Sequence, residues 1–392
     1  MKFFQLTKHM FETSTIELSA SAYRHNLRFI NFRLKAGVRL CSVVKGNAYG
    51  HGLTQFVKMA MQAGVDYFAV HSSEEAYLLK QGITKMPDLF IMGAMEESAV
   101  KWAVENAVEF AVFDRERLDM ALSYARESKK KAKIHLEIET GMRRTGFSIK
   151  DIQELSKCLH KHASNITFQG LFTHYAGAES QANHFRISKQ IDNFNQALKA
   201  FKTEKLVPIY NHSACSAALL NYPETQGNMV RVGILQYGYW PNRETHIRYC
   251  EESKSTPDLL KRIIRWTTKV MAVKEVSKGN FIGYGTSYFA HKNMKLAIVP
   301  IGYAHGYSRN LSNVGSVIIN GIVCNVIGTV NMNSLTVDIT LAGKVKPGDE
   351  VVLIGSQNGN SISVSSFSEQ SHQLNYEMLT RLPMNIPRIV KK

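Results

Sequence analysis

A lysine stands directly after the first long apolar run of the sequence, where it could act as a nucleophile. The run at residues 38–44 ends at Lys45, which precedes a glycine-containing segment, residues 46–52. If the run is a buried strand, desolvation at its end lowers the pKa of Lys45 and favours a neutral amine. Such an amine can form a Schiff base with a carbonyl compound. A lysine that simply extends into solvent is the alternative, so the chemistry depends on other residues.

Cationic and hydrogen-bonding residues recur at the ends of later apolar runs. They are Arg144 after the fifth run, His174 after the sixth, His212 and Ser216 after the seventh, and Arg231, Gly233 and Ile234 in the eighth. These residues can act together with Lys45 only if the fold brings the ends of the runs to one place.

The alternation of apolar runs with helical segments predicts such a fold. Eight runs alternate with segments of helical periodicity, as in a (β/α)8 barrel. The helical segments 72–81 and 114–129 begin at Ser72 and Asp114, which are good N-cap residues, and a third is expected at 151–162. An open doubly wound sheet is the alternative, although it usually needs fewer strands. The runs span residues 38–44, 66–70, 88–92, 108–113, 133–139, 166–173, 207–210 and 229–236.

A barrel would gather the ends of these runs at one mouth, because its parallel strands present their carboxyl ends on the same side. The loops after the seventh and eighth strands of such barrels often hold a phosphate group. Ser216 and the backbone N–H groups of Gly233 and Ile234 are suitable donors to it. A Schiff-base lysine, a phosphate cradle and partners for an aromatic ring together indicate pyridoxal phosphate (PLP).

The sequence changes character after about residue 252, where short β-like runs replace the helical periodicity. Asn320-Gly321 between two such runs is typical of a type I′ hairpin, and a final segment, residues 365–382, has a helical pattern. The predicted strands span residues 269–276, 296–300, 316–319, 322–326, 334–339 and 350–354. We therefore expect a barrel over residues 14–250 and a mostly β domain over residues 251–390.

Composition sets further limits. The 392 residues suffice for two domains with a buried core. Five scattered cysteines, the lack of a signal-like stretch and the lack of an apolar run of about 18 residues favour a soluble cytoplasmic protein. The net charge of +16 suggests a nucleic-acid binder. However, no RNA-binding motif, zinc-ligand spacing or helix-turn-helix signature supports that reading, and we expect no metal site.

Several motifs resemble, in order, those of the alanine racemase family, a fold-type III group of PLP enzymes. The resemblance covers about residues 14–390. It implies a barrel followed by a β domain, and a racemase that interconverts L- and D-alanine and supplies D-alanine for peptidoglycan. The motifs are Val-Lys-Gly-Asn-Ala-Tyr-Gly-His-Gly at 44–52, Ile-Gly-Tyr-Gly-Thr at 282–286, Ile-Gly-Tyr-Ala at 301–304, Gly-Thr-Val-Asn-Met-Asn at 328–333 and the C-terminal segment 375–388.

The resemblance implies two catalytic bases. Lys45 would bind PLP covalently and then serve the D-substrate face, while Tyr284 would serve the L-substrate face. A proton can then leave one face of Cα and return to the other. Because the reference pKa of tyrosine is about 10, its neighbours must tune it to act as a base near neutral pH. In the family this tyrosine comes from the partner subunit, which implies a homodimer with shared active sites.

The resemblance also assigns residues to the cofactor. Arg231, as a permanent cation, would donate a hydrogen bond to the pyridine nitrogen and keep it unprotonated, and His212 would support Arg231. His174 would pack near the ring, with a purely structural core histidine as the alternative. The phosphate would be held by Tyr49, Ser216, Tyr376 and the amides of Gly233 and Ile234.

Four further residues are assigned to the substrate. Arg144 would reach the phenolic oxygen of the cofactor and the substrate carboxylate. Tyr303 would line the entrance, and Met332 would contact the substrate. Glu137 stands where some members carry a carbamylated lysine, and it supplies a similar negative charge that would orient Arg144.

Three positions depart from the family pattern. Cys215 replaces a phosphate-binding asparagine, which could weaken cofactor binding. Asn333 and His305 replace aspartates near the entrance, which makes the entrance less acidic. These changes leave open a racemase of broader range that acts on serine or basic amino acids. A decarboxylase is disfavoured by Arg231, and a non-catalytic PLP-binding protein is disfavoured by the β domain with Tyr284.

Overall fold

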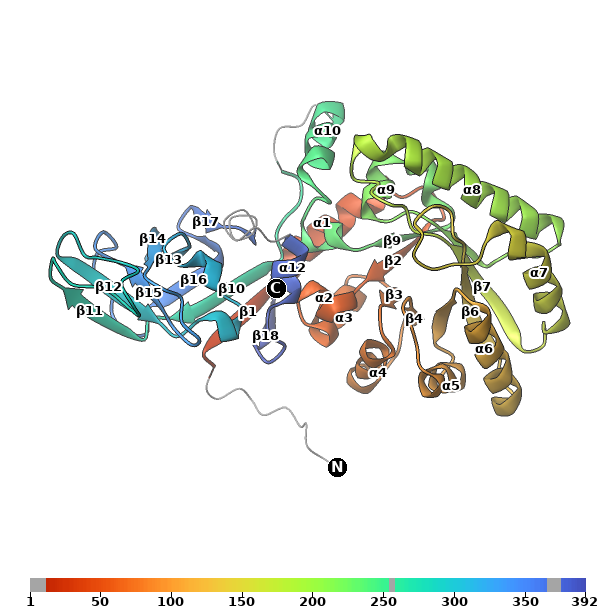
Figure 1. Cartoon of the computed structure of the whole chain (residues 1–392), viewed down its shortest axis with the longest axis horizontal. Coiled ribbons are helices and arrows are strands. Elements are labelled where there is room, and N and C mark those ends of the chain that lie inside the picture. Colours follow the sequence, from red (N-terminus) through yellow and green to blue (C-terminus); the bar gives the residue numbers. More distant parts are fainter. Residues whose placement is uncertain (1–11, 254–257, 365–374) are drawn as a thin grey trace. The chain divides into compact units, whose positions relative to one another are not determined.

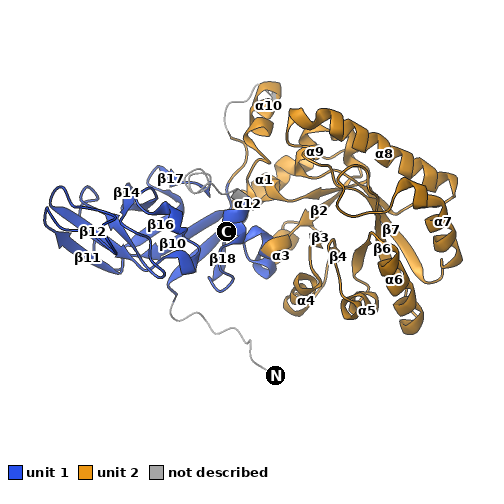
Figure 2. Ribbon diagram, viewed as in Figure 1, with its two compact units in different colours: residues 1–20, 47–56, 262–392 blue, residues 21–46, 57–261 orange. Residues whose placement is uncertain are grey.

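The computed structural model describes residues 12–253, 258–364 and 375–392. The chain divides into two compact units, which we describe separately (Figure 2). The barrel unit comprises residues 21–46 and 57–261, and the β unit comprises residues 1–20, 47–56 and 262–392. We keep the predicted ranges 14–250 and 251–390 as a proposal about which residues form each functional part.

The barrel unit contains eight parallel strands, in the order β8-β7-β6-β5-β4-β3-β2-β9 (Figure 1). Two backbone hydrogen bonds nearly close the barrel, from Asn228 N–H to the Asn211 carbonyl at 3.3 Å and from Arg231 N–H to the Ala214 carbonyl at 3.1 Å. The predicted barrel is thus confirmed. Its strands are β2 (Arg39–Val43), β3 (Tyr67–Val70), β4 (Asp88–Ile91), β5 (Glu109–Val112), β6 (Ala132–Glu137), β7 (Ile166–Phe172), β8 (Tyr210–His212) and β9 (Met229–Val232).

Helices alternate with these strands and cover the barrel. Two predicted N-caps are confirmed: Ser72 Oγ accepts from Glu75 N–H at 3.2 Å, and Asp114 Oδ1 accepts from Arg117 N–H at 2.8 Å. The helices are α1 (Ala20–Arg33), α3 (Leu53–Gln62), α4 (Ser73–Gly82), α5 (Glu97–Glu105), α6 (Arg115–Ser128), α7 (Ile152–Lys161), α8 (His184–Thr203), α9 (Ser216–Asn221) and α10 (Arg243–Ser253), with short 3-10 turns between some of them.

Two strand predictions need correction. The seventh run, residues 207–210, is mostly outside β8, because Val207 and Ile209 are 72% and 50% exposed and Pro208 has no N–H to donate to a ladder. The eighth run was predicted to extend to residue 236, but β9 ends at Val232 and a 3-10 turn, Ile234–Tyr237, follows. The apolar character of residues 234 and 235 correctly indicated that they are buried, but it did not predict their 3-10 conformation.

The β unit contains a sheet of ten strands, with the order β11-β12-β15-β14-β13-β16-β10-β1-β18 and β17 paired with β16. The predicted hairpin is confirmed, because Ile319 pairs with Ile322 and the turn residues Asn320 and Gly321 have φ of 52° and 77°. The strands are β1 (Ser14–Ser19), β10 (Ile264–Lys269), β11 (Ala272–Val276), β12 (Met294–Val299), β13 (Ser316–Ile319), β14 (Ile322–Ile327), β15 (Leu335–Asp338), β16 (Glu350–Gln357), β17 (Asn360–Ile362) and β18 (Arg388–Lys391).

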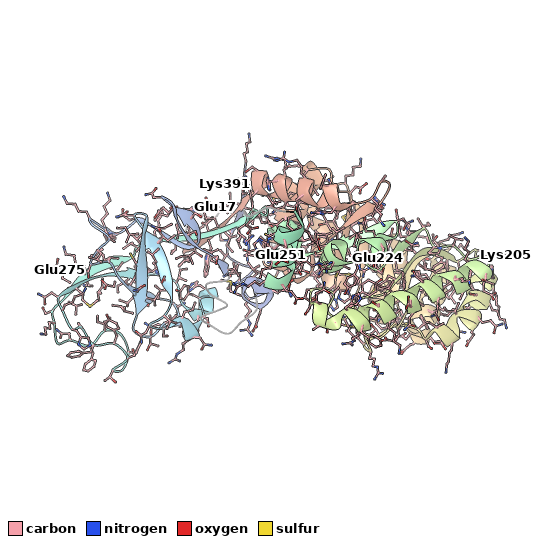
Figure 3. All side chains as sticks on the ribbon, turned by 90° about the horizontal axis from the view of Figure 1, so that it is seen from above. Glu17, Lys205, Glu224, Glu251, Glu275 and Lys391 are labelled. Atoms are coloured by element: carbon pink, nitrogen blue, oxygen red, sulfur yellow. The ribbon has the colours of Figure 1, made fainter. Side chains whose placement is uncertain are left out.

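The sequence did not predict that β1, the first strand of the chain, joins this sheet. β1 pairs antiparallel with β10 and parallel with β18. The pairing is reinforced by charge, since Glu17 on β1 lies 3.4 Å from Lys391 Nζ (Figure 3) and 3.2 Å from the Arg265 guanidinium. Of the predicted C-terminal helix, residues 365–374 lie outside the described residues, and the helix α12 spans Asn375–Thr380.

Two general expectations can be compared with the described part of the chain. No helix there combines the length and apolar character needed to cross a membrane. All five cysteines lie within the described residues as free thiols.

Candidate active site

The carboxyl ends of the barrel strands carry the predicted site residues of this unit. Lys45 follows β2 after Val44, whose N–H still bonds to the Ala69 carbonyl at 2.8 Å. Glu137 and His212 are the last residues of β6 and β8, and Arg231 lies within β9. Because parallel strands share one direction, these side chains meet at one mouth of the barrel.

Lys45 is a free amine at this mouth. The residue retains exposed surface, and its Nζ makes no hydrogen bond or ion pair with the described residues. Protein nevertheless surrounds the amine closely, and this desolvation lowers the pKa of Lys45 below its ordinary value. The positive charges of Arg144 and Arg231 lower the pKa further, and Glu75 partly opposes them. The lowered pKa increases the neutral, nucleophilic fraction of Lys45 at a given pH.

His174 belongs to the same cluster. Burial lowers its pKa to about 3, and the charges of Arg231, Arg144 and Lys45 contribute in that order. Its imidazole makes no hydrogen bond with the described residues. Arg144, Arg231 and, when protonated, Lys45 thus surround the mouth together with a histidine that stays neutral, and an anionic ligand would relieve the repulsion between the positive charges.

Arg144 and Glu137 face one another at the edge of the cluster. The Arg144 guanidinium lies 3.9 Å from Glu137 Oε1, and Thr145 Oγ1 donates to Glu137 Oε2 at 2.7 Å. Burial raises the pKa of Glu137, against the lowering effects of Thr145, Arg144 and Arg231. The Arg144 side chain is 56% exposed, so its guanidinium remains accessible to a ligand.

Arg231 is held rigidly inside the barrel. Its Nη1 donates to His212 Nδ1 at 2.6 Å and to the His212 carbonyl, and its Nη2 donates to the Thr173 carbonyl at 2.7 Å. Burial lowers its pKa. The Nε–H makes no hydrogen bond with the described residues, so one donor of a fixed guanidinium is left for a ligand. This donor suits the pyridine nitrogen of PLP.

The predicted phosphate donors of the barrel are close together. Ser216 Oγ accepts from Gly233 N–H at 3.0 Å, which differs from the expectation that this amide is available for phosphate. The Ser216 hydroxyl donates to none of the described residues, and Ile234 begins a 3-10 turn, where its N–H has no partner within the turn. A lysine amine, an arginine donor and this hydroxyl–amide pair together fit the functional groups of PLP.

The other two predicted phosphate ligands lie together in the β unit. The rings of Tyr49 and Tyr376 have centroids 6.0 Å apart. Tyr49 ends α2 (Lys45–Tyr49), a single turn in which residues 46–49 all have positive φ, so it is left-handed. This conformation is costly for non-glycine residues. Hydrogen bonds such as that from Leu53 N–H to Asn47 Oδ1, at 2.8 Å, stabilise it.

The remaining predicted residues lie on three adjoining loops of the β unit. Tyr303 N–H donates to the Asn331 carbonyl at 3.0 Å, which joins its loop to the loop of Met332. Thr329 Oγ1 donates to Ser287 Oγ at 3.1 Å and connects that loop to the loop of Tyr284. Tyr284, Tyr303 and Met332 are 76%, 42% and 55% exposed, so this face offers large apolar groups to a partner.

The structure shows the surroundings of the three residues that depart from the family pattern. Cys215 is the N-cap residue of α9, and its side chain makes no capping hydrogen bond. His305 Nδ1 accepts from Gly302 N–H at 3.3 Å, so this ring closes its own turn. Asn333 is exposed beside Met332.

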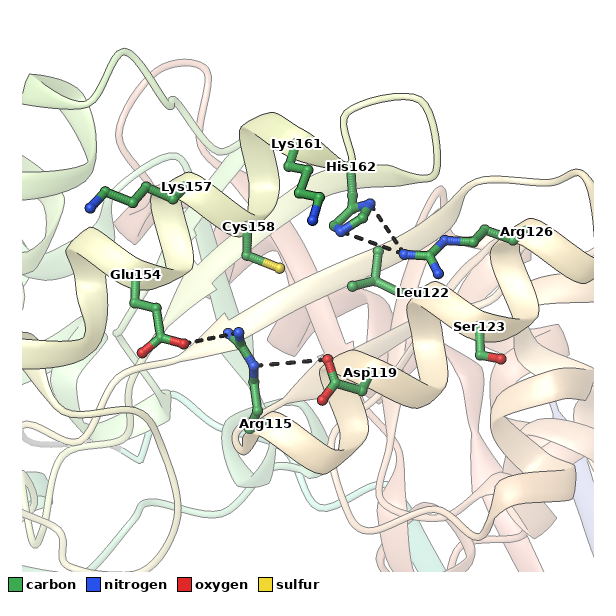
Figure 4. A pocket seen from close by; sticks show the side chains of 10 residues that line it. All are labelled: Arg115, Asp119, Leu122, Ser123, Arg126, Glu154, Lys157, Cys158, Lys161 and His162. Atoms are coloured by element: carbon green, nitrogen blue, oxygen red, sulfur yellow. Dashed lines mark hydrogen bonds and ion pairs between the residues drawn. The ribbon is translucent and has the colours of Figure 1, made fainter.

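A pocket of about 470 Å³ lies elsewhere, between α6 and α7 (Figure 4). Arg115 crosses it to pair with Glu154 at 2.9 Å and contacts Asp119 at 3.8 Å. None of the predicted site residues lines this pocket, so it is separate from the barrel mouth. The lining residues are Arg115, Asp119, Leu122, Ser123, Arg126, Glu154, Lys157, Cys158, Lys161 and His162.

Sequence reasoning missed two buried polar residues beneath the mouth, Glu109 on β5 and His135 on β6. His135 contacts His212 at 2.8 Å and Glu109 at 2.8 Å. A signal was present for Glu109, which is the single polar residue of β5, whereas His135 lies in β6 between the polar residues Lys133 and Glu137 and was less conspicuous. Such a residue needs a partner inside the core.

A lysine-bearing (β/α)8 barrel followed by a β domain is the fold-type III architecture. Two family models match the chain: the alanine racemase N-terminal domain over residues 18–241 and the C-terminal domain over residues 263–390. The alanine racemase of Clostridium perfringens (strain SM101) is 34% identical over 96% of this chain and 95% of the relative.

Solved structures agree with the sequence comparisons. Alanine racemase from Bacillus anthracis with bound L-Ala-P has a TM-score of 0.87 and 31% identity, covering 98% of this chain and 96% of the other. Alanine racemase from Bartonella henselae with covalently bound pyridoxal phosphate has a TM-score of 0.81 and 25% identity, covering 97% and 99%. The chain belongs to the alanine racemase family. It is therefore an amino-acid racemase, of a family that in general depends on PLP.

Proposed function

We propose that this protein interconverts L- and D-alanine with PLP bound through Lys45 and with Tyr284 as the second base. The cluster of Lys45, Arg144, His174 and Arg231 is the observation that carries the proposal. It combines a lysine amine of lowered pKa with cations that have few acidic partners, which suits an anionic cofactor and a carboxylate substrate. The alanine racemases among its relatives support alanine as substrate over a broader range.

Each residue of the mouth has a defined task in this proposal. When bound, PLP supplies an electron-accepting ring that acidifies the Cα–H of the substrate. Arg231 Nε–H donates to the ring nitrogen and, as a cation, keeps that nitrogen unprotonated. Arg144 binds the substrate carboxylate, and Glu137 orients Arg144 through the 3.9 Å contact. His174 packs near the ring as a neutral imidazole.

The phosphate is held by two groups of residues in this proposal. Ser216 and the Ile234 amide donate from the barrel, and Gly233 acts mainly through its bond to Ser216. The hydroxyls of Tyr49 and Tyr376 donate from the β unit. The two bases then exchange the Cα proton, Lys45 on the D-substrate face and Tyr284 on the L-substrate face.

The exposed face around Tyr284 supports a homodimer in which each subunit completes the site of the other. A tyrosine that is 76% exposed, near the exposed Phe281 and Phe289, would otherwise present a large apolar surface to water. In this arrangement Tyr303 lines the entrance and Met332 contacts the substrate of the partner subunit's site.

The proposal is tested by isotope exchange in deuterated water. Purified protein with PLP and L-alanine should lose optical rotation and incorporate deuterium at Cα, and Lys45→Ala should abolish both. Tyr284→Phe should lose racemisation, whereas the control Tyr77→Phe, at an exposed tyrosine on α4, should not. Deuterium incorporation without loss of rotation in the unmodified protein would contradict the two-base assignment.

Subunit mixing tests the shared site. Lys45→Ala and Tyr284→Phe proteins are each inactive, but a mixed dimer contains one site with both native residues. Random exchange should restore about a quarter of the native sites. No recovery after verified exchange would show that each subunit uses its own tyrosine.

A further inference from the structure

A line of hydrogen-bonded polar side chains crosses the interior of the barrel below Arg231. Arg231 Nη1 lies 2.6 Å from His212 Nδ1, His212 Nε2 lies 2.8 Å from His135 Nδ1, and His135 Nε2 lies 2.8 Å from Glu109 Oε2. The four residues come from four strands and are at most 6% exposed. Buried polar groups are costly unless each is paired, so this line is a specific feature of the core.

The chemistry of arginine fixes the direction of every bond in the line. A guanidinium has donors and no acceptor, so His212 Nδ1 must accept and carry no proton. A neutral His212 then has its proton on Nε2 and donates it to His135 Nδ1. By the same reasoning His135 has its proton on Nε2 and donates to Glu109. Both imidazoles are therefore neutral Nε2–H tautomers.

Glu109 accepts the last hydrogen bond of the line. Besides His135, its carboxylate accepts from the Tyr67 hydroxyl and, at 2.9 Å, from Gln169 Nε2. Three donors converge on one carboxylate, and an ionised carboxylate is an acceptor only. A protonated carboxyl group would carry its own O–H at one oxygen and would have fewer acceptor sites for these three donors, so the geometry favours the ionised carboxylate.

The surroundings keep both imidazoles neutral. Phe90 stacks on His135 with centroids 4.2 Å apart, and Phe172 stacks on His212 with centroids 5.2 Å apart. Burial lowers the pKa of both histidines, and the charge of Arg231 lowers them further. For His135 the hydrogen bond and charge of Glu109 act in the opposite direction, but they do not outweigh burial.

Further ionisable groups lie below this line, around Tyr67. Arg39 lies over the Tyr67 ring, 4.8 Å from its centroid, and donates to Tyr210 at 2.6 Å. Burial raises the pKa of Tyr67 well above its ordinary value, and Glu109, Cys41 and Tyr210 add to the effect. Tyr67 is therefore a neutral donor to Glu109.

We propose that Glu109 is a positioning residue, which fixes the tautomers of His135 and His212 and thereby holds the guanidinium of Arg231. Nη1 and Nη2 of Arg231 make four hydrogen bonds, to His212, Thr173 and Ser213, and these bonds hold the guanidinium plane within the barrel. With His212 held as an acceptor, the Arg231 Nε–H keeps one orientation toward the mouth. The catalytic consequence rests on the proposed function, whereas the tautomers and the direction of the bonds do not.

The tautomers can be measured directly in the unmodified full-length protein. With ¹⁵N-labelled histidine and a deuterated background, long-range ¹H–¹⁵N correlation distinguishes Nε2–H, Nδ1–H and cationic imidazoles. The signals of His135 and His212 are assigned by their loss in His135→Gln and His212→Gln. We expect both to be neutral Nε2–H tautomers from pH 5.5 to 9. An Nδ1–H tautomer or a cation at either position would overturn the proposal, whether or not the protein racemises alanine.

Two variants of Glu109 separate positioning from bulk stability. Glu109→Leu removes the acceptor and should leave His135 and His212 in mixed tautomers, while Glu109→Gln keeps an acceptor oxygen and should preserve the Nε2–H signals. In the racemase assay, Glu109→Leu should lower kcat on the order of tenfold, the range for lost outer partners of a functional histidine. KM for alanine should change little, because Arg144 binds the carboxylate, and Glu109→Gln should recover most of the loss.

The outcomes separate the two proposals. Expected tautomers with no racemisation in any variant would refute the proposed function and leave the direction of the bonds intact. Unchanged tautomers in a folded Glu109→Leu protein would refute the role of Glu109. If Glu109→Leu fails to fold, the spectra of the unmodified protein and of Glu109→Gln still decide the matter.

Discussion

A methyl group added at Gly170 should collide with His135 and destabilise the barrel. Gly170 on β7 pairs with His135 on β6, and a Cβ at this position would lie 2.0 Å from His135 Nδ1 and 2.7 Å from its Cε1. The ring cannot swing aside freely, because His212 and Glu109 hold its two nitrogens, each at 2.8 Å. Glycine is therefore required here by space rather than by backbone conformation.

The magnitude follows from these distances. Ordinary contact begins at 3.4 Å, so the ring must move by 3.4 − 2.0 = 1.4 Å, which is enough to break both hydrogen bonds. Overpacking costs about 1–3 kcal/mol, and each buried group left without a partner costs about 1–3 kcal/mol. A loss of at least about 3 kcal/mol is expected for Gly170→Ala. In a unit of this size, that lowers Tm by about 6–12 °C.

The assay is thermal unfolding followed by circular dichroism or calorimetry, with a double-mutant cycle as the control. In a His135→Ala background the added methyl enters space that the imidazole has left, so Gly170→Ala should cost little there. If Gly170→Ala lowered Tm equally in both backgrounds, the collision with His135 would not be the cause. An unchanged Tm in the single variant would refute the argument altogether.

Three further predictions concern the site and the second unit. Glu137→Gln should raise KM for alanine more than it lowers kcat in steady-state assays, because the charge that orients Arg144 is lost; unchanged kinetics would contradict this role. His51 is fully buried, which lowers its pKa to about 4; between pH 6.5 and 4 only the unfolded chain binds its proton. Stability should therefore fall by up to about 3 kcal/mol as the pH falls through this window, and His51→Asn should reduce the decline in Tm. Gly321→Val should lower Tm in thermal unfolding, because φ is 77° and a Cβ would lie 2.7 Å from Asn358 Cβ, whereas Val323→Thr on the exposed face of β14 should not.

The sequence determined most of the barrel and indicated the residues that we propose as the reacting groups. Apolar runs separated by helical segments predict the strands of a buried parallel sheet, and all eight predicted strands are present. β8 is shifted toward its C-terminal side, because the segment around Pro208 is exposed. The turn Asn320-Gly321 was also local information, because few residues adopt two successive positive φ values. Lys45 and His174 were recognisable because they directly follow apolar runs, whereas Arg144, in the loop after the fifth run, and Arg231, within the eighth, were recognised through the family resemblance.

Only the tertiary structure decided which distant segments meet. The position of β1 between β10 and β18 depends on backbone pairing across more than 240 residues, as in the pair Ser14–Thr268, for which a local pattern contains no information. The left-handed turn after Lys45 is unfavourable by itself and persists because surrounding contacts hold it. In the sequence, Glu109 was an isolated polar residue in an apolar strand, and His135 was one of three polar residues of β6. Only the closed barrel brings them into line with His212 and Arg231. Because the folded core excludes water, the direction of each of these hydrogen bonds affects stability.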